Sequence, residues 1–322
     1  MMNFIDRIDP ALRPVLEMIP ADLLDLNDIP GTRAKVKAMF SMMPTPVIEG
    51  VSSRTEYVPG PSADRGSGPE VMVRIYEPSA RPENLPALLW IHGGGYVLGD
   101  VDMDDAKAAE MAVSINCVVV SVEYRLAPEH PFPAPVEDCY AALVWLANNA
   151  AALGVDASRI AIGGASAGGG LTAGLALLAR DRGEVNVAFQ LPIYPMIDDR
   201  CITPSSHAIT DPRVWNRESN LLGWQAYLGH EPGSDDTSPY AAATRATDLS
   251  GLPPAYIPVG EMDLFLDENI EYAQRLIQAG VPTELHIYQG SFHGSDSFAP
   301  DVDSSKRFLS GCKDALRRAL HG

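Results

Sequence analysis

The stretch "IAIGGASAGGG" (residues 160–170) places one serine, Ser166, inside a dense run of glycine and alanine. A short apolar run, typical of a β-strand, leads into it, and a helical pattern begins within it. A turn this tight between a strand and a helix leaves room only for very small side chains beside the serine. We therefore expect Gly164 and Gly168 to let the Ser166 hydroxyl project from a sharp turn, at a helix N-terminus that favours developing negative charge.

A glycine-rich turn of this kind can also hold a phosphate or a dinucleotide. A P-loop needs a Gly-Lys-Ser/Thr sequence, and the stretch contains neither a lysine nor the G-x-G-x-x-G register of a dinucleotide site. The spacing Gly164-x-Ser166-x-Gly168 instead fits the turn that exposes a serine nucleophile. Because this short motif is common by chance, the interpretation needs a second feature.

A second glycine cluster, in "WIHGGGYVLGD" (residues 90–100), supplies that feature. It places His92-Gly93-Gly94-Gly95 directly after a predicted strand and upstream of the serine. Acyl transfer needs backbone N–H groups to stabilise an oxyanion, each worth about 2.7–4 kcal/mol. These donors come from the residue after the nucleophile and from a loop after an earlier strand. We therefore expect the N–H groups of Gly93, Gly94 and Ala167 to form an oxyanion hole, with a chemically inert glycine hairpin as the alternative.

Strand and helix patterns alternate from about residue 55 almost to the end of the chain, which predicts an α/β fold with a mostly parallel sheet covered on both faces. Residues 1–50 and about 199–250 depart from this alternation. We expect a catalytic domain over residues 51–322, with an N-terminal cap segment over residues 1–50 and a cap insert at about 199–250. The predicted strands cover residues 71–78, 87–93, 117–124, 159–165, 187–195, 254–260 and 283–290.

Three motifs in order, "HGGG", "EYRLAPEHPFPA" (residues 123–134) and "GASAG", give the chain its family resemblance. It resembles the hormone-sensitive-lipase-like (bacterial family IV) esterases of the α/β-hydrolase superfamily over roughly residues 55–318. The resemblance implies an eight-stranded, mostly parallel sheet with a helical cap, and hydrolysis of carboxylic esters through an acyl-enzyme on Ser166 without cofactor or metal. Two departures, Ala165 where members often carry Asp or Thr and Leu264 where they often carry Pro, bear on subgroup and substrate rather than on activity.

His293 is the expected general base among the seven histidines. It lies in "YQGSFHGSD", just past the last predicted strand, and catalytic groups of parallel sheets lie at the carboxyl ends of strands. His286 falls inside that strand and is expected to be a packed side chain. The other five lie in the glycine loop (residues 92–99), a proline-rich segment, the cap insert or the C-terminus: His92, His130, His207, His230 and His321.

The acid that orients the base should lie between the serine and the histidine, because this fold runs Ser, Asp/Glu, His. "YIPVGEMDLFLDENIEYA" offers Glu261, Asp263, Asp267 and Glu268. Asp267 heads a helix and is expected to cap it. Asp263 matches the family position, so we expect it to fix the tautomer of the imidazole and stabilise the imidazolium.

Four further charged residues flank these motifs. Asp198 and Asp199 follow the strand after the nucleophile helix, and we interpret them as structural, tethering Arg200 or the cap. Glu123 and Arg125 are expected to form a buried pair that supports the glycine loop, or else a solvated strand end.

Substrate choice is expected to lie in the cap, and the absence of a large apolar stripe favours short- to medium-chain acyl esters. Amide, lactone or acetyl-group hydrolysis on the same residues, and a non-catalytic receptor on the hydrolase fold, are the alternatives. The family resemblance suggests a homodimer through the last strand and helix. The side chains that could line an acyl pocket, or simply pack on the sheet, are Met39, Met42, Met43, Trp215, Trp224 and Tyr227.

The chain carries 24 basic and 42 acidic residues, a formal charge of −18, which disfavours nucleic acid and anionic membranes as partners. Charged residues interrupt the N-terminal apolar stretch, so we expect no signal peptide, and no apolar run approaches the roughly 18 residues of a membrane span. A cytoplasmic location is expected. The cysteines lie far apart without metal-ligand spacing, so buried thiols and no metal site are expected at Cys117, Cys139, Cys201 and Cys312.

Overall fold

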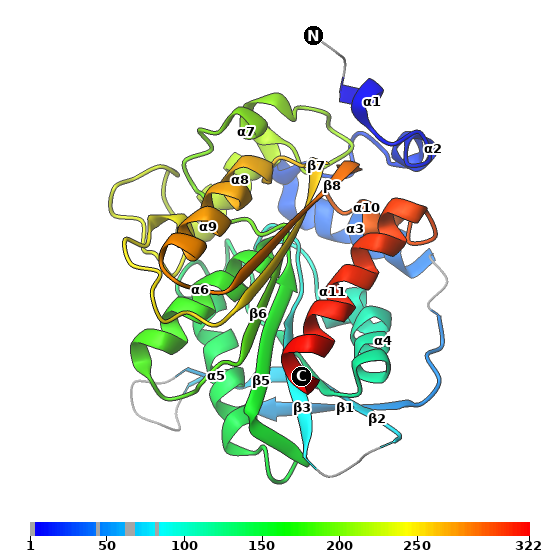
Figure 1. Ribbon diagram of the computed structural model, residues 1–322. Helices are drawn as coiled ribbons and strands as arrows, with labels where there is room; N and C mark the ends of the chain where they lie inside the picture. The colour runs from blue at the N-terminus through cyan, green and yellow to red at the C-terminus, as the bar shows by residue number, and fades with distance from the viewer. Residues whose placement is uncertain (1–3, 43–45, 62–67, 81–83) are drawn as a thin grey trace.

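An eight-stranded sheet forms the centre of the computed structural model, which describes residues 4–42, 46–61, 68–80 and 84–322 (Figure 1). The strand order is β1-β2-β4-β3-β5-β6-β7-β8; β2 pairs antiparallel with β1 and β4, and every pairing from β4 to β8 is parallel. The predicted α/β-hydrolase fold is thereby confirmed. The strands are β1 (Val51–Val58), β2 (Val71–Pro78), β3 (Leu85–Ile91), β4 (Val118–Glu123), β5 (Val155–Ala165), β6 (Phe189–Ile193), β7 (Ala255–Met262) and β8 (Thr283–Phe292).

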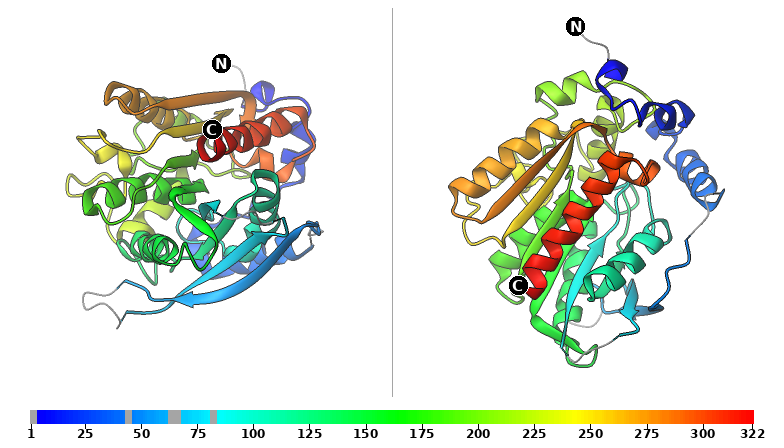
Figure 2. Two further views of the ribbon diagram at one scale, coloured as in Figure 1. Left: turned by 60° about the horizontal axis from the view of Figure 1, so that its bottom comes forward. Right: turned by 45° about the vertical axis from the view of Figure 1, so that its right-hand side comes forward.

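Helices cover both faces of the sheet (Figures 1 and 2). One face carries α4 (Asp105–Ile115) and α11 (Asp303–His321), and the other carries α5 (Ala134–Asn148), α6 (Ala167–Arg182) and α9 (Leu266–Gln278). The central strand β3 is buried along its whole length, because both faces are covered. Its successive side chains alternate between two apolar clusters, with Leu88 and Trp90 on the α11 side and Leu89 and Ile91 on the other.

Helices from the N-terminal segment and from the insert lie toward the end of the sheet where the parallel strands have their carboxyl ends (Figure 1). The insert contacts the N-terminal segment, since the Ser219 hydroxyl lies 3.5 Å from the carbonyl of Leu24. Among the described residues, no helix is long and apolar enough to cross a membrane. The helices of the N-terminal segment are α1 (Phe4–Arg7), α2 (Arg13–Met18), η1 (Leu26–Asp28) and α3 (Ile29–Met42), and those of the insert are α7 (Pro204–Ala208), α8 (Arg217–Leu228) and η3 (Ala243–Arg245).

The sequence patterns located seven of the strands and missed β1. This strand pairs only with β2 at one edge of the sheet, and seven of its eight side chains are solvent-exposed or half-buried without alternation, so it lacks the apolar pattern of a strand. The cysteine prediction is confirmed, because all four thiols are free and buried. Two short elements complete the described fold, η2 (Val101–Asp104) and α10 (Ser295–Phe298).

Candidate active site

Ser166 is the single residue between β5 and α6, and its backbone adopts φ 58° and ψ −119°. A positive φ is strained for a residue with a side chain, so surrounding bonds must hold it. Its N–H donates to the Ile193 carbonyl (2.9 Å), and its own carbonyl accepts from Gly170 (2.9 Å) and Met196 (3.1 Å). These bonds fix the sharp turn that the glycine pattern predicted.

The glycines beside Ser166 allow backbone segments to touch. A Cβ atom on Gly164 would lie 2.4 Å from the Ile91 carbonyl oxygen, and one on Gly168 would lie 2.1 Å from the same oxygen and 2.5 Å from that of His92. Distances below 3.0 Å are essentially never seen for real Cβ atoms. The carboxyl end of β3 and the start of the glycine loop therefore lie directly against the serine turn.

The structure brings Ser166, His293 and Asp263 into one hydrogen-bonded chain. His293 Nε2 lies 2.9 Å from Ser166 Oγ, and His293 Nδ1 lies 2.8 Å from Asp263 Oδ2. Asp263 is 1% exposed, and its other oxygen accepts the N–H of Phe265 (3.0 Å). Because an ionised carboxylate can only accept, the Nδ1 proton sits between His293 and Asp263, and Nε2 is free to accept the serine proton.

The three remaining acid candidates have other partners. Glu261 accepts the N–H of Gly290 (3.0 Å), and Glu268 is fully buried on α9. The expectation that Asp267 caps its own helix is wrong: the N-cap of α9 is Phe265, and Asp267 instead accepts the N–H of Ser205 (2.6 Å) at the start of α7. Asp267 therefore joins the insert to α9.

Two hydrogen bonds orient the peptide groups of the glycine loop. The Tyr124 hydroxyl donates to the His92 carbonyl (3.0 Å), and His92 Nδ1 donates to the Gly93 carbonyl (2.8 Å). In a planar trans peptide the N–H points opposite to the carbonyl. The N–H groups of Gly93 and Gly94 are therefore turned away from these two partners.

These N–H groups belong to a loop that touches the serine turn. A Cβ on Gly93 would lie 3.5 Å from the Ser166 Cβ, which places this peptide beside the nucleophile. Ala167 is the first residue of α6, so its N–H has no acceptor within the helix. Of the three expected donors of an oxyanion hole, Gly93 and Ala167 therefore lie directly beside Ser166, and Gly94 is the next residue of the same loop.

The role of Tyr124 was not foreseen, although its motif was noted. Its ring stacks on His92 with centroids 4.2 Å apart, and both side chains are at most 2% exposed. The only sequence signal was the position of "EYR" at the end of a buried strand. An aromatic residue at such a position is equally typical of a side chain that only packs in the core.

The expected pair of Glu123 and Arg125 is wrong, because each has a different partner. Glu123 accepts the N–H of Val101 (2.8 Å), just beyond the glycine loop, and burial raises its pKa. Arg125 forms an ion pair with the fully buried Asp138 on α5 (2.8 Å). Both residues brace the segments around the glycine loop, but separately.

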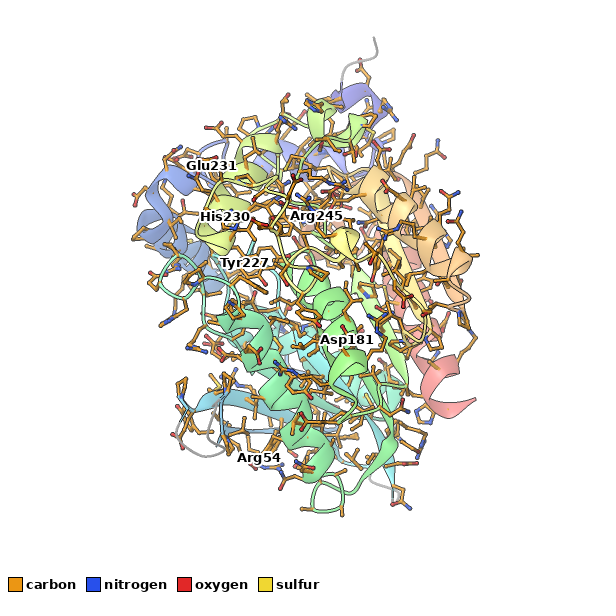
Figure 3. The ribbon with its side chains drawn as sticks, turned by 90° about the vertical axis from the view of Figure 1, so that its left-hand side faces the viewer. Arg54, Asp181, Tyr227, His230, Glu231 and Arg245 are labelled. Atoms are coloured by element: carbon orange, nitrogen blue, oxygen red, sulfur yellow. The ribbon has the colours of Figure 1, made fainter. Side chains whose placement is uncertain are left out.

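The structural interpretation of Asp198 and Asp199 is confirmed. Asp198 pairs with Arg200 (2.8 Å). Asp199 forms an ion pair with Arg245 of the insert (2.7 Å; Figure 3 labels this arginine). It also accepts a hydrogen bond from the hydroxyl group of Thr237 (3.0 Å). Burial opposes its charge, but hydrogen bonding to Arg245 outweighs it, so the pKa of Asp199 is lowered.

The expectation that His286 is packed is wrong. It is solvent-exposed and stacks on Tyr288, with centroids 4.1 Å apart. The reason is topological: β8 is the last strand of the sheet, so much of it is not covered.

The aromatic residues of the insert pack on the glycine loop. A Cβ on Gly95 would lie 2.0 Å from the Trp215 ring, so only glycine fits beneath that indole. Trp224 is fully buried, and Tyr227 (Figure 3) stacks on Tyr96 with centroids 3.9 Å apart. Of the methionines named as possible pocket residues, Met39 is half-buried, Met42 is 83% exposed, and Met43 lies outside the described residues.

Comparison with known proteins gives consistent matches. A protein family described by its α/β-hydrolase fold matches residues 88–297 of this chain. Carboxylesterase NlhH of Mycobacterium tuberculosis is 38% identical over 98% of this chain and 97% of its own length, and esterase LipI of the same species is 36% identical over 98% and 96%. The solved structure of a bacterial heroin esterase is 44% identical, with a TM-score of 0.92 over 99% of this chain and all of that one. This chain belongs to the α/β-hydrolase family and, within it, to the esterases that resemble hormone-sensitive lipase.

Proposed function

We propose that the protein is a serine carboxylesterase in which Ser166, His293 and Asp263 form the catalytic triad. The observation that carries the proposal is the continuous chain from Ser166 Oγ through both imidazole nitrogens to Asp263 Oδ2, at 2.9 and 2.8 Å. These distances are within hydrogen-bond reach, as a nucleophile and its base require.

In the proposed reaction His293 Nε2 takes the Ser166 proton as Oγ attacks the ester carbonyl carbon. The N–H groups of Gly93, Gly94 and Ala167 hold the resulting oxyanion. His293 then gives the proton to the departing alcohol, leaving an acyl group on Ser166. A water that loses its proton to His293 attacks this acyl-enzyme, and the carboxylic acid leaves as Ser166 regains its proton.

Esters of short- to medium-chain acids are the proposed substrates, with the shortest acyl groups preferred. Ser166 is only 8% exposed and the side chain of His293 only 11%, so the reacting atoms lie in a confined space. Trp215 packs over Gly95 and further narrows the space beside the glycine loop. The similar heroin esterase supports the same preference, because heroin carries acetyl esters.

The test is a fluorophosphonate probe followed by mass spectrometry, with p-nitrophenyl esters of increasing chain length. We expect labelling at Ser166 and highest kcat/KM with acetate or butyrate. Ser166→Ala should lower kcat by a factor of about 10⁴ or more. Ser121→Ala, at another buried serine, is the matched control and should retain activity. Absence of labelling would indicate a non-catalytic receptor. Labelling of Ser166 in a protein that cleaves only amides or lactones would indicate a different acyl chemistry. A maximum of kcat/KM at long acyl chains would contradict the preference for short acyl groups.

We also propose that two copies associate through β8 and α11. The edge position of β8 supports this, since β8 pairs only with β7 among the described strands and Ile287 is 42% exposed there. Light scattering should give twice the monomer mass, and Ile287→Arg should give the monomer mass. A monomeric wild-type protein at micromolar concentration would contradict the proposal.

A further inference from the structure

Arg33 reaches from α3 to the glycine loop. Its Nε donates to the Val97 carbonyl (2.8 Å), and its Nη2 donates to the Ala127 carbonyl (2.8 Å). Nη1 and Nη2 also bind the two carboxylate oxygens of Glu129, at 2.7 and 2.8 Å. Most of the five N–H groups of the guanidinium are thus engaged, in the fork geometry that only arginine provides.

The two carbonyls that Arg33 binds belong to the support of the glycine loop. The N–H groups of Val97 and Leu98 donate to the Gly94 carbonyl, at 3.1 and 2.8 Å, so Val97 lies on the arm that closes the loop back on Gly94. The N–H of Ala127 donates to the Tyr96 carbonyl (3.0 Å), which ties the neighbouring segment to the same loop. One guanidinium therefore joins both segments from outside.

The charge of Arg33 is balanced where it lies. Hydrogen bonding to Arg33 lowers the pKa of Glu129 to about 2, so the ion pair persists at any pH used to assay an esterase. Glu129 is half exposed and Arg33 is 29% exposed, so solvent weakens the electrostatic attraction between them. What the pair supplies is a fixed direction for the guanidinium toward the Val97 and Ala127 carbonyls.

We propose that Arg33 is a positioning residue of the reaction: through Val97 and Gly94 it holds the N–H donors of the glycine loop where the oxyanion forms. The inference rests on the ester hydrolysis proposed above. It assigns a role in transition-state stabilisation to the N-terminal segment, which lies outside residues 88–297 that the family match covers. Such a residue affects kcat rather than substrate binding, because the oxyanion exists only after attack.

The experiment compares Arg33→Ala and Arg33→Lys with a matched control, Arg13→Ala. Arg13 lies on α2 of the same segment and also donates to two backbone carbonyls, those of Ile8 (3.1 Å) and Asp6 (2.9 Å), which are not in the glycine loop. Lysine keeps the charge and the aliphatic stem, but its single ammonium group cannot reproduce the fork. The readouts are kcat and KM for p-nitrophenyl acetate, Tm, and rescue of Arg33→Ala by millimolar guanidinium chloride against sodium chloride of equal ionic strength.

We expect both Arg33 variants to lose kcat by about 10-fold with little change in KM, because misplaced donors forfeit part of what a deleted donor would cost. Guanidinium should restore kcat in Arg33→Ala and leave the wild type and Arg13→Ala unchanged. If the inference is right, Arg13→Ala retains wild-type kcat, whatever its Tm. Wild-type kcat in both Arg33 variants, or a kcat loss in Arg13→Ala equal to that of the Arg33 variants, would overturn the inference. If Arg33→Ala does not fold, the kcat of Arg33→Lys decides between these outcomes. A wild-type protein inactive on every ester would instead refute the proposed function.

Discussion

Replacing Gly168 with alanine should push the glycine loop away from Ser166. Gly168 is the second residue of α6, and an added Cβ would lie 2.1 Å from the Ile91 oxygen and 2.5 Å from the His92 oxygen. Both clashes are with backbone, so no side-chain rotation relieves them. The carbonyl of Ile91 would have to move by about 1 Å to reach even a tight contact, and the glycine loop begins at the next residue.

A displacement of about 1 Å at reacting groups costs on the order of 100-fold in rate. We therefore expect Gly168→Ala to lower kcat by about 100-fold, which corresponds to about 2.7 kcal/mol of transition-state stabilisation. Helix propensity acts in the opposite direction, because alanine is favoured over glycine within a helix by up to about 1 kcal/mol. A loss of activity without a comparable loss of stability would therefore identify the contact with the glycine loop as the cause.

Gly174→Ala is the matched control. Gly174 lies in the same helix, and its added Cβ would lie 2.3 Å from the backbone oxygen of Tyr240, which belongs to the insert and not to the glycine loop. Both variants gain the same helix propensity and meet a carbonyl at a similar distance. The assay is kcat for p-nitrophenyl acetate, with Tm measured by differential scanning calorimetry. Wild-type kcat in Gly168→Ala, or an equal kcat loss in Gly174→Ala, would refute the reasoning.

Three further predictions, which use four substitutions, test other parts of the molecule. Asp263→Asn should lower kcat by about 10⁴-fold by removing the acceptor that fixes the imidazole tautomer, whereas Asp267→Asn should retain near wild-type kcat in the same ester assay. Greater damage from Asp267→Asn would show that the acid is misassigned. Tyr124→Phe removes the hydroxyl that orients the His92 carbonyl and should lower kcat about 10-fold at unchanged KM; an effect on KM alone would contradict that role. Burial raises the pKa of Glu268 well above its ordinary value of 4.5. Between the ordinary pKa and the raised one, the folded state holds one more proton than the unfolded state, so the stability of the protein falls as pH rises, by up to about 1.4 kcal/mol per pH unit. Glu268→Gln has no carboxyl group to titrate, so its free energy of unfolding lacks this pH dependence. Measured by urea unfolding, the stability of the variant relative to wild type should increase from pH 5.5 to pH 7.5. A stability difference that stays constant over this range would show that Glu268 is ionised in the folded protein.

The residues of the candidate site were predictable where local backbone geometry restricts the sequence. Gly164, Gly168, Gly93 and Gly94 stand where a Cβ would strike a carbonyl, and Gly95 stands where it would strike an indole ring, so residue type alone points to these turns. The position of His293 followed from its place just after a strand, because parallel strands bring their carboxyl ends to one edge. These inferences needed only short stretches of chain and the alternation of strands and helices.

The partners of charged residues were not predictable in the same way. Arg125 could pair with any nearby carboxylate, and only the packing of α5 against the sheet selects Asp138. His286 sits in a strand pattern that looks buried, but its exposure depends on β8 being the last strand, which is a property of the strand order. Such contacts depend on segments far apart in sequence, and a local pattern contains no information about them.

The N-terminal segment contacts both sides of the candidate site. The N–H of Asp9 donates to the carbonyl of Gly290 (3.0 Å), three residues before His293, and Gly290 adopts a positive φ that lets the two backbones meet. At its other end Arg33 binds the support of the glycine loop. Ile8, beside Asp9, and Leu12 and Leu16, between the two contacts, are buried, so the segment is fixed by apolar packing as well as by these bonds. Because one continuous piece of chain touches the residues before His293 through Asp9 and the support of the glycine loop through Arg33, a change at either of these two contacts alters the site without any contact with substrate.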